Sequence, residues 1–215
     1  MRCICGKPIC LHEFTDRQEH GQPRPRVLSS FKETRGQSCP RSDHMSHRPL
    51  VEINSLSRDE FVRVVGPVFE HSPWIAEMTW AKKPFADLAH LHHVLCTTVK
   101  NSAEKKQLAL IRAHPDLVGR AALAGTLTKE STNEQASAGL NKLSPEEIVL
   151  FQKQNAAYKN KFDFPFVICA RLNKKEAILA GFEQRLKNSR AQEIKTALEE
   201  ICKIAELRLR DLIDN

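Results

Sequence analysis

Residues 189–212 read SRAQEIKTALEEICKIAELRLRDL, and their hydrophobic pattern indicates a helix. When successive residues are rotated by about 100°, the apolar side chains fall on one face: Ile194, Ala197, Leu198, Ile201, Ile204, Ala205 and Leu212. Such a stripe is typical of an amphipathic helix that packs one side against a core. Ser189 is expected to cap this helix, because its hydroxyl can accept a hydrogen bond from a free backbone N–H of the first turn.

Arg208 interrupts the apolar stripe near its middle, whereas Arg210 falls on the opposite, solvated face. A guanidinium group is permanently charged, so burying it costs free energy unless it is paired. Two interpretations remain open. Arg208 either pairs with a carboxylate of the protein, which is the commoner arrangement, or it lines a cavity and holds an anionic group of a substrate.

Helix signals recur upstream of this stretch and predict an all-α fold. Ser57-x-x-Glu60 and Ser144-x-x-Glu147 have the spacing of capping boxes, in which a serine and a glutamate satisfy each other's backbone N–H groups. Further N-terminal caps are expected at three positions, which are Ser72, Ser102 and Asn173. We therefore expect a single compact domain over residues 49–215, built from about eight helices.

Residues 164–170, with the sequence Phe-Pro-Phe-Val-Ile-Cys-Ala, break the helical pattern. A continuous apolar run that contains proline is expected to be extended or irregular. If such a segment is buried, its backbone N–H and C=O groups need partners. We expect it to fill the core, and the alternative is a wall that hydrogen-bonds a ligand.

Residues 1–48 differ in composition from the rest of the chain. They contain 9 of the 33 Lys and Arg residues but only 5 of the 26 Asp and Glu residues, and they have no sustained hydrophobic period. A stretch such as residues 21–26, Gly-Gln-Pro-Arg-Pro-Arg, buries too little apolar surface to offset its loss of conformational entropy. We therefore predict a disordered basic leader, with Met45 as an alternative start.

The composition argues against several classes of protein. No run of about 18 apolar residues occurs, so neither a membrane-spanning helix nor a membrane partner is expected, and the N-terminus lacks a signal-peptide pattern. No basic stripe with interleaved aromatic residues is found, which argues against nucleic acid as a partner. Cys3, Cys5, Cys10 and His12 do not have the paired spacing of a zinc site. We expect an intracellular protein without a metal or a cofactor.

His114 is one of nine histidines and the best placed for acid–base chemistry. It stands where a helix must end, because Pro115 restricts the residue before it, and an imidazole titrates near neutral pH. The simpler interpretation is an exposed loop histidine. A nearby group, His90, His92 and His93, lacks the i, i+4 spacing of a helical zinc pair and is expected to lie mostly at the surface.

Glu134 is a further candidate, because Ser131-x-x-Glu134 also has the spacing of a capping box. The simpler interpretation is that both side chains only satisfy backbone donors. The N–H groups of a helix N-terminus also suit an anionic or polar ligand. The residues from Ser131 to Gln135 can therefore form both a helix cap and the rim of a site.

Several short motifs follow one another in a specific order: His114-Pro115-Asp116-Leu117, Gly125-Thr126-Leu127-Thr128, Glu130-Ser131, Glu134-Gln135, Ser137-Ala138-Gly139-Leu140, Phe164-Pro165-Phe166-Val167-Ile168 and Leu207-Arg208-Leu209. Each motif alone is modest, but the ordered set is specific. From about residue 50 to residue 212 the chain resembles the 2-oxo-4-hydroxy-4-carboxy-5-ureidoimidazoline (OHCU) decarboxylase family. The resemblance implies an all-helical homodimer that converts OHCU, a small-molecule substrate, to (S)-allantoin and carbon dioxide without a cofactor.

The resemblance also implies roles for particular residues. His114 is similar to the proton donor of the family, and Glu134 and Arg208 to the residues that position the substrate. The positions that match ligand-contacting segments are Pro115, Ser131, Thr132, Asn133, Glu134, Gln135, Phe166, Val167, Ile168, Cys169 and Ala170. The family is often peroxisomal, but the chain ends in Ile213-Asp214-Asn215 rather than in a Ser-Lys-Leu signal, so the peroxisome and the cytoplasm both remain expectations. The rival interpretation is a helical interaction module without catalytic activity.

Overall fold

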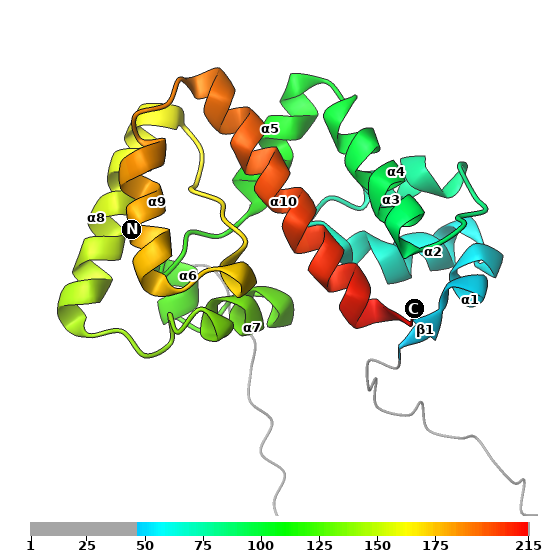
Figure 1. Cartoon of the computed structure of the whole chain (residues 1–215), viewed down its shortest axis with the longest axis horizontal. Coiled ribbons are helices and arrows are strands. Elements are labelled where there is room, and N and C mark those ends of the chain that lie inside the picture. Colours follow the sequence, from blue (N-terminus) through cyan, green and yellow to red (C-terminus); the bar gives the residue numbers. More distant parts are fainter. Residues whose placement is uncertain (1–46, 215) are drawn as a thin grey trace, which may run out of the picture. The chain divides into compact units, whose positions relative to one another are not determined.

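Ten α-helices make up most of residues 47–214, the part of the chain that this computed structural model describes (Figure 1). They are α1 (Leu50–Ser55), α2 (Arg58–Val65), α3 (Trp74–Trp80), α4 (Leu88–Lys100), α5 (Glu104–Ala113), α6 (Arg120–Leu123), α7 (Lys129–Ser137), α8 (Pro145–Phe162), α9 (Lys175–Arg185) and α10 (Arg190–Leu212). The all-α prediction is confirmed. The structure has more helices than the eight or so expected, because α1 and α6 are too short to show a hydrophobic period. The predicted leader lies outside the described residues except for His47 and Arg48.

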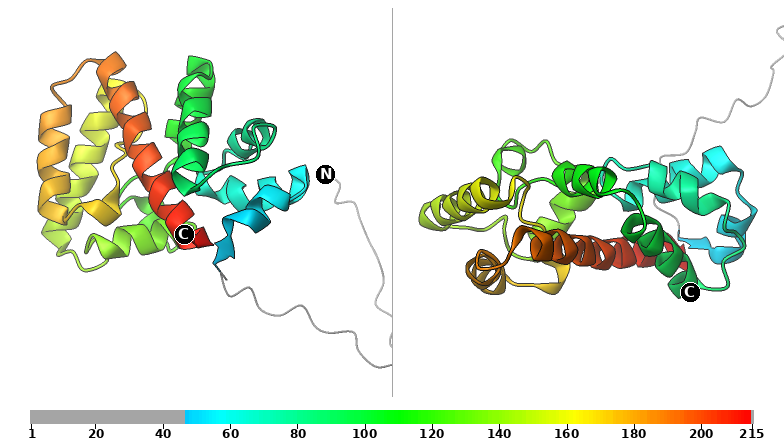
Figure 2. Two further views of the ribbon diagram at one scale, coloured as in Figure 1. Left: turned by 45° about the vertical axis from the view of Figure 1, so that its right-hand side comes forward. Right: turned by 90° about the horizontal axis from the view of Figure 1, so that it is seen from above.

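The longest helix, α10, carries the predicted apolar stripe into the core. Ala197, Ile201, Ala205 and Leu209 on this helix are each at most 1% exposed. The helix packs against α4, α5 and the short 3-10 turn η1 (Gly66–Val68). Figures 1 and 2 show α10 running between the α8–α9 pair and the group formed by α2, α3 and α4. Residues near its C-terminal end are thereby brought close to segments from the first third of the chain.

The capping boxes at Ser57, Ser144 and Ser189 are present, the last with Gln192 as the reciprocal partner. Three other predicted caps are wrong by one residue, since the N-caps are Pro73, Ala103 and Lys174. The physical reason is visible for two of these, because Ser102 and Asn173 use their side chains to bond the carbonyls of preceding turns. The predicted cap of α7 is also wrong. The N-cap is Thr128, whose hydroxyl accepts a hydrogen bond from the backbone N–H of Ser131.

The first and last described segments meet in a short parallel pair of strands, β1 (Arg48–Pro49) and β2 (Ile213–Asp214). Arg48 pairs with Ile213, and Pro49 pairs with Asp214. The pair anchors the C-terminal end of α10 beside α1 (Figure 1). Within residues 47–214, none of the helices has the length and apolarity required to cross a membrane.

The prediction that an irregular segment interrupts the helices is confirmed for residues 164–169. Residues 164–169 have no regular secondary structure and lead into a second 3-10 turn, η2 (Ala170–Leu172). Phe164, Phe166 and Cys169 are at most 2% exposed. An irregular stretch of backbone therefore passes through a helical core, where its peptide groups need partners within the protein or from a ligand.

Candidate active site

His114 lies at the C-terminal end of α5 with an extended backbone, and Pro115 follows it. Its side chain is buried, with the residue only 8% exposed. The ring atom Nδ1 lies 2.9 Å from the carbonyl oxygen of Leu110, in the last turn of α5. A carbonyl can only accept, so Nδ1 carries the proton in the neutral imidazole and Nε2 holds a lone pair. The helix end thereby selects one tautomer.

Burial lowers the pKa of His114 from its usual value near 6.5 to about 4. The hydrogen bond to Leu110 and the negative charge of Glu70 act in the opposite direction, but they do not offset the loss of hydration. The imidazole is therefore neutral at neutral pH. In that state Nε2 can take a proton before it can give one.

The His114 side chain lines a small cavity of about 30 Å³, which has room for about one water molecule. Nine of the residues predicted to contact a substrate or to act on it line this cavity: His114, Pro115, Ser131, Glu134, Gln135, Phe166, Val167, Ile168 and Ala170. They come from α5, α7 and the irregular segment. The structure therefore brings together motifs that lie far apart in the sequence.

Four predicted residues do not line this cavity. Thr132 borders a separate apolar groove beside α6 and α8, and Asn133 faces a surface pocket on the other side of α7. Cys169 is buried, and its backbone N–H points to Glu200 instead. Arg208 is hydrogen-bonded to Glu134, which lines the cavity, but does not line it itself.

Arg208 is held by two carboxylates. Its Nε and Nη2 atoms donate to the two oxygens of Glu134 at 2.7 and 2.9 Å, and Nη1 donates to Glu70 at 3.1 Å and to the carbonyl of Pro67 at 3.4 Å. Burial lowers the pKa of Arg208, but the bond to Glu134 and the charges of both carboxylates outweigh it and raise the pKa. The interpretation of an internal ion pair therefore describes this structure.

Glu70 was missed by the sequence analysis. It is 4% exposed and lies in the turn between η1 and α3. Its carboxylate accepts hydrogen bonds from Arg208 and from the hydroxyls of Ser131 and Thr128, each of the hydroxyl bonds being 3.3 Å. The available signal was an acidic residue directly after the apolar stretch from residue 65 to residue 69, but a single carboxylate in a turn does not reveal its partners.

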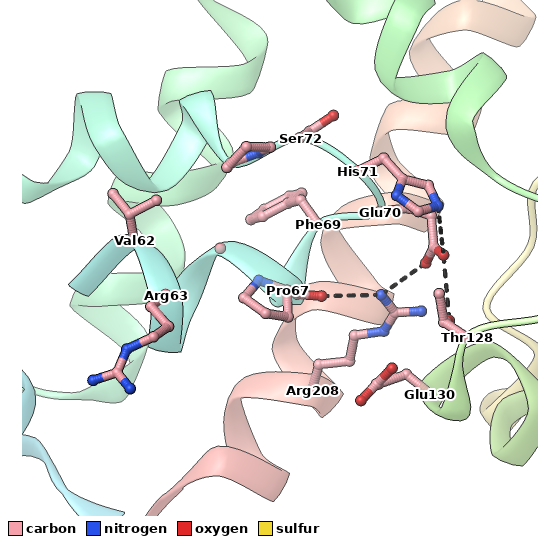
Figure 3. Close-up of a pocket in the computed structure, with 12 residues that line it drawn as sticks. Val62, Arg63, Pro67, Phe69, Glu70, His71, Ser72, Thr128, Glu130 and Arg208 are labelled. Carbon is pink, nitrogen blue, oxygen red and sulfur yellow. Dashed lines mark hydrogen bonds and ion pairs between the residues drawn. The ribbon is translucent and has the colours of Figure 1, made fainter. Parts of the chain in front are cut away.

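The Arg208 network separates the His114 cavity from a larger pocket. Figure 3 shows this pocket, of about 440 Å³, with Glu70 and Arg208 at one end and Pro67 and Phe69 beside them. Ser131 and Glu134 line the small cavity, whereas Glu70 and Arg208 line the large pocket. Arg208 can therefore reach the His114 cavity only if Glu134 moves away from it.

The histidines on α4 and the cysteines within residues 47–214 do not line the His114 cavity. His90 and His93 are exposed, but His92 is half-buried and its Nε2 lies 2.8 Å from the Cys202 carbonyl oxygen. The cysteines of the described part of the chain, Cys96, Cys169 and Cys202, are buried and unpaired by disulfides. No cluster of side chains within residues 47–214 has an arrangement that could hold a metal ion.

The fold and the site define a helical enzyme domain with an acid–base histidine at a small, mostly apolar cavity. The family model described as OHCU decarboxylase matches residues 54–210, and the chain belongs to this family. The OHCU decarboxylase of Amia calva is 43% identical over 162 residues, which cover 75% of this chain and 93% of that protein.

Two solved structures have the same fold. The crystal structure of an (S)-allantoin synthase aligns with a TM-score of 0.62 and 26% identity, covering 78% of this chain and 54% of that chain. The chain thus spans about half the length of that protein. A structure of OHCU decarboxylase in the presence of (S)-allantoin aligns with a TM-score of 0.55 and 22% identity over 66% of this chain and 92% of that chain. The second likeness supports the fold alone.

The burial of His114 predicts a pH-dependent stability. Because its folded pKa of about 4 lies below its unfolded value near 6.5, the unfolded chain binds more protons between these values. The contribution of His114 to the unfolding free energy is therefore fully present above pH 6.5 and is lost as the pH falls toward 4, by up to about 3 kcal/mol. Urea unfolding of His114→Asn should show a smaller loss between pH 7 and pH 4.5 than the wild type. The exposed His93→Asn is the matched control, and a His114→Asn profile equal to it would contradict the prediction.

The Arg208 network predicts a large loss of stability for Arg208→Ala. Removing the guanidinium leaves two buried carboxylates without their cation, which costs about 3–5 kcal/mol in comparable sites. Arg210→Ala on the exposed face of α10 breaks only a pair with Glu206 and should cost less than about 1 kcal/mol. Chemical denaturation of both variants measures the difference. Equal small losses would show that Glu70 and Glu134 do not depend on Arg208.

Proposed function

We propose that this chain decarboxylates OHCU to (S)-allantoin and carbon dioxide, the last step in the conversion of urate to allantoin. The observation that carries the proposal is the neutral His114, with its Nε2 lone pair available at a cavity that it shares with Glu134 and the irregular segment. Membership of the family supports the same reaction. A helical interaction module gives no reason for a histidine to be held in one tautomer at a cavity.

The substrate explains why so few side chains suffice. Its carboxylate sits on a ring carbon that also bears a hydroxyl and is bonded to the carbon of a C=N group. When the C–C bond to the carboxylate breaks, the electron pair forms a C=C bond and the C=N electrons move to nitrogen. That nitrogen then takes a proton from solvent. The substrate itself is the electron sink, so the reaction needs no cofactor.

His114 then completes the reaction by moving a proton. Its neutral Nε2 takes the proton of the ring hydroxyl as that C–O bond becomes a carbonyl. The resulting imidazolium gives the proton to the neighbouring carbon, which bears the ureido group. Delivery from one fixed side chain places the proton on one face and makes the product a single enantiomer. Acid–base catalysis of this kind contributes about 10²–10⁴-fold to a rate.

Glu134 and Arg208 are proposed to position the substrate by exchanging partners. The cavity of about 30 Å³ is too small for OHCU, so its walls must move when the substrate enters. If Glu134 turns to accept hydrogen bonds from substrate N–H groups, the Nε and Nη2 atoms of Arg208 become free. The substrate carboxylate can then take the same bidentate position, replacing one carboxylate by another.

We also propose that the protein is a homodimer and that it is located in the peroxisome or the cytoplasm, both on the family resemblance. The chain has a mass of 24.4 kDa, so a dimer is expected to have about twice this mass in light scattering. The same mass at all concentrations down to the micromolar range would support a permanent dimer. A mass that stays at the single-chain value would contradict the proposal.

Replacing His114 by asparagine tests the proton transfer. His114→Asn retains an N–H donor for the Leu110 carbonyl but has no basic nitrogen, so enzymatic turnover of freshly generated OHCU should fall at least about 100-fold. The optical rotation of the allantoin formed should also fall to that of the uncatalysed reaction. The control His93→Asn should leave both unchanged. Near-normal turnover with His114→Asn would remove this residue from the proposed role, and a wild-type protein no faster than buffer would refute the proposed function.

A further inference from the structure

The irregular segment passes between two buried charged side chains. The carbonyl oxygen of Val167 accepts a hydrogen bond from Nη1 of Arg185 at 2.7 Å, and the N–H of Cys169 donates to Oε2 of Glu200 at 2.8 Å. Arg185 is 8% exposed at the end of α9, and Glu200 is 9% exposed in the middle of α10. Hydrogen bonds to charged groups are about twice as strong as neutral ones. The two side chains therefore hold the segment firmly at alternate residues.

Each of these charges is balanced by its own partner. Arg185 donates from Nε to Glu193 at 2.9 Å, and Glu193, which is fully buried, also accepts from Asn188 and from the Tyr158 hydroxyl. Glu200 pairs with Lys203 at 2.6 Å. Apolar residues of similar size often stabilise a core as well as a buried ion pair does. What the charges add here is a donor and an acceptor directed at two particular peptide groups.

The Arg185 guanidinium also fixes a side chain of the segment. Its central carbon lies 4.4 Å from the centre of the Phe166 ring, which is stacked on Phe182 at 3.9 Å on the helix α9. Cation–π contact and aromatic stacking both restrict the ring. The orientation of the segment at residues 166 and 167 is thus fixed through both side chain and backbone.

Fixing the odd-numbered residues orients the even-numbered ones. In a trans peptide unit the C=O and the N–H point in opposite directions. Since the C=O of Val167 faces Arg185, the N–H of Ile168 in the same peptide unit points away from Arg185. The N–H of Cys169 faces Glu200, so the C=O of Ile168 points away from Glu200. Ile168 lines the His114 cavity, and its N–H and C=O have no hydrogen-bond partner within residues 47–214. A peptide donor and a peptide acceptor are therefore left for whatever enters the cavity.

We infer that Arg185 and Glu200 are positioning residues that turn the Ile168 N–H and C=O toward an –NH–C(=O)– group of the substrate, as two peptide groups pair in a sheet. This inference rests on the proposed function. OHCU and allantoin both carry such groups in the ring and in the ureido chain. Because these groups do not react, the contact holds substrate and product alike. It should therefore affect binding more than the chemical step.

Glu200 offers the sharper test because it can be replaced in two ways. Glu200→Gln keeps an oxygen that accepts from the Cys169 N–H, whereas Glu200→Leu removes the acceptor. Glu200→Leu should raise both the KM for OHCU and the Kd for (S)-allantoin, measured by calorimetry, about tenfold, the effect of one well-formed hydrogen bond. Its kcat should stay within about threefold of wild type, and Glu200→Gln should restore KM and Kd to within about threefold.

Arg190→Gln is the matched control. Arg190 bonds the carbonyl of Phe162 at 3.3 Å and its guanidinium lies over the ring of Phe164, at the start of the segment and away from the cavity, so KM and Kd should remain at wild-type values. If circular dichroism shows that Glu200→Leu does not fold, Arg185→Lys tests the inference in its place. This variant keeps a cation beside Glu193, but its side chain is shorter and does not reach the Val167 carbonyl in the same way. It should raise KM and Kd in the same way.

Three further outcomes separate the inference from the proposed function. Variants that turn over OHCU and bind (S)-allantoin like Arg190→Gln would overturn the positioning role while leaving the decarboxylase intact. A loss of kcat at unchanged KM and Kd would also overturn it. A wild-type protein that neither turns over OHCU nor binds (S)-allantoin would instead refute the proposed function.

Discussion

A guanidinium shared by two carboxylates in the interior is the interaction on which the candidate site depends. Arg208 joins Glu70, in the turn after η1, to Glu134 on α7, and Glu70 in turn binds Ser131. Two negative charges face one positive charge, and the hydroxyls of Ser131 and Thr128 help to solvate the excess. Buried ion pairs add little net stability. This one instead fixes the positions of three segments around the His114 cavity.

Burial of His114 has two consequences that act together. Loss of hydration keeps the imidazole neutral by lowering its pKa to about 4, and the Leu110 carbonyl at the end of α5 places the proton on Nδ1. An exposed histidine would be partly protonated and free to turn. The same burial limits the access of bulk water to Nε2, so a proton held there is expected to pass to the bound molecule rather than to solvent.

A non-helical segment in a helical core allows the backbone itself to bind a ligand. In a helix the peptide groups hydrogen-bond to one another. A helix therefore presents side chains to a cavity, but few unpaired N–H and C=O groups except at its ends. Residues 164–169 are not helical, so their peptide groups are open to other partners, and Arg185 and Glu200 bind the C=O of Val167 and the N–H of Cys169. The N–H and C=O of Ile168 remain available. Three buried charged residues near this segment, Arg185, Glu193 and Glu200, are thereby related to recognition rather than to stability alone.

The sequence by itself determined the all-α class, the capped starts of α2, α8 and α10, the irregular run and the anomalous position of Arg208. Each of these depends on residues within a few positions of one another, so a local period or spacing reveals it. Only the tertiary structure decided that Arg208 pairs with Glu134 and Glu70, which lie 74 and 138 positions away. The tertiary structure also shows that Ser131 bonds Glu70 in the buried network instead of capping a helix. It decided the tautomer of His114 through the Leu110 carbonyl. Spacing along one helix cannot specify which distant side chain meets a buried charge, because that depends on how the helices pack.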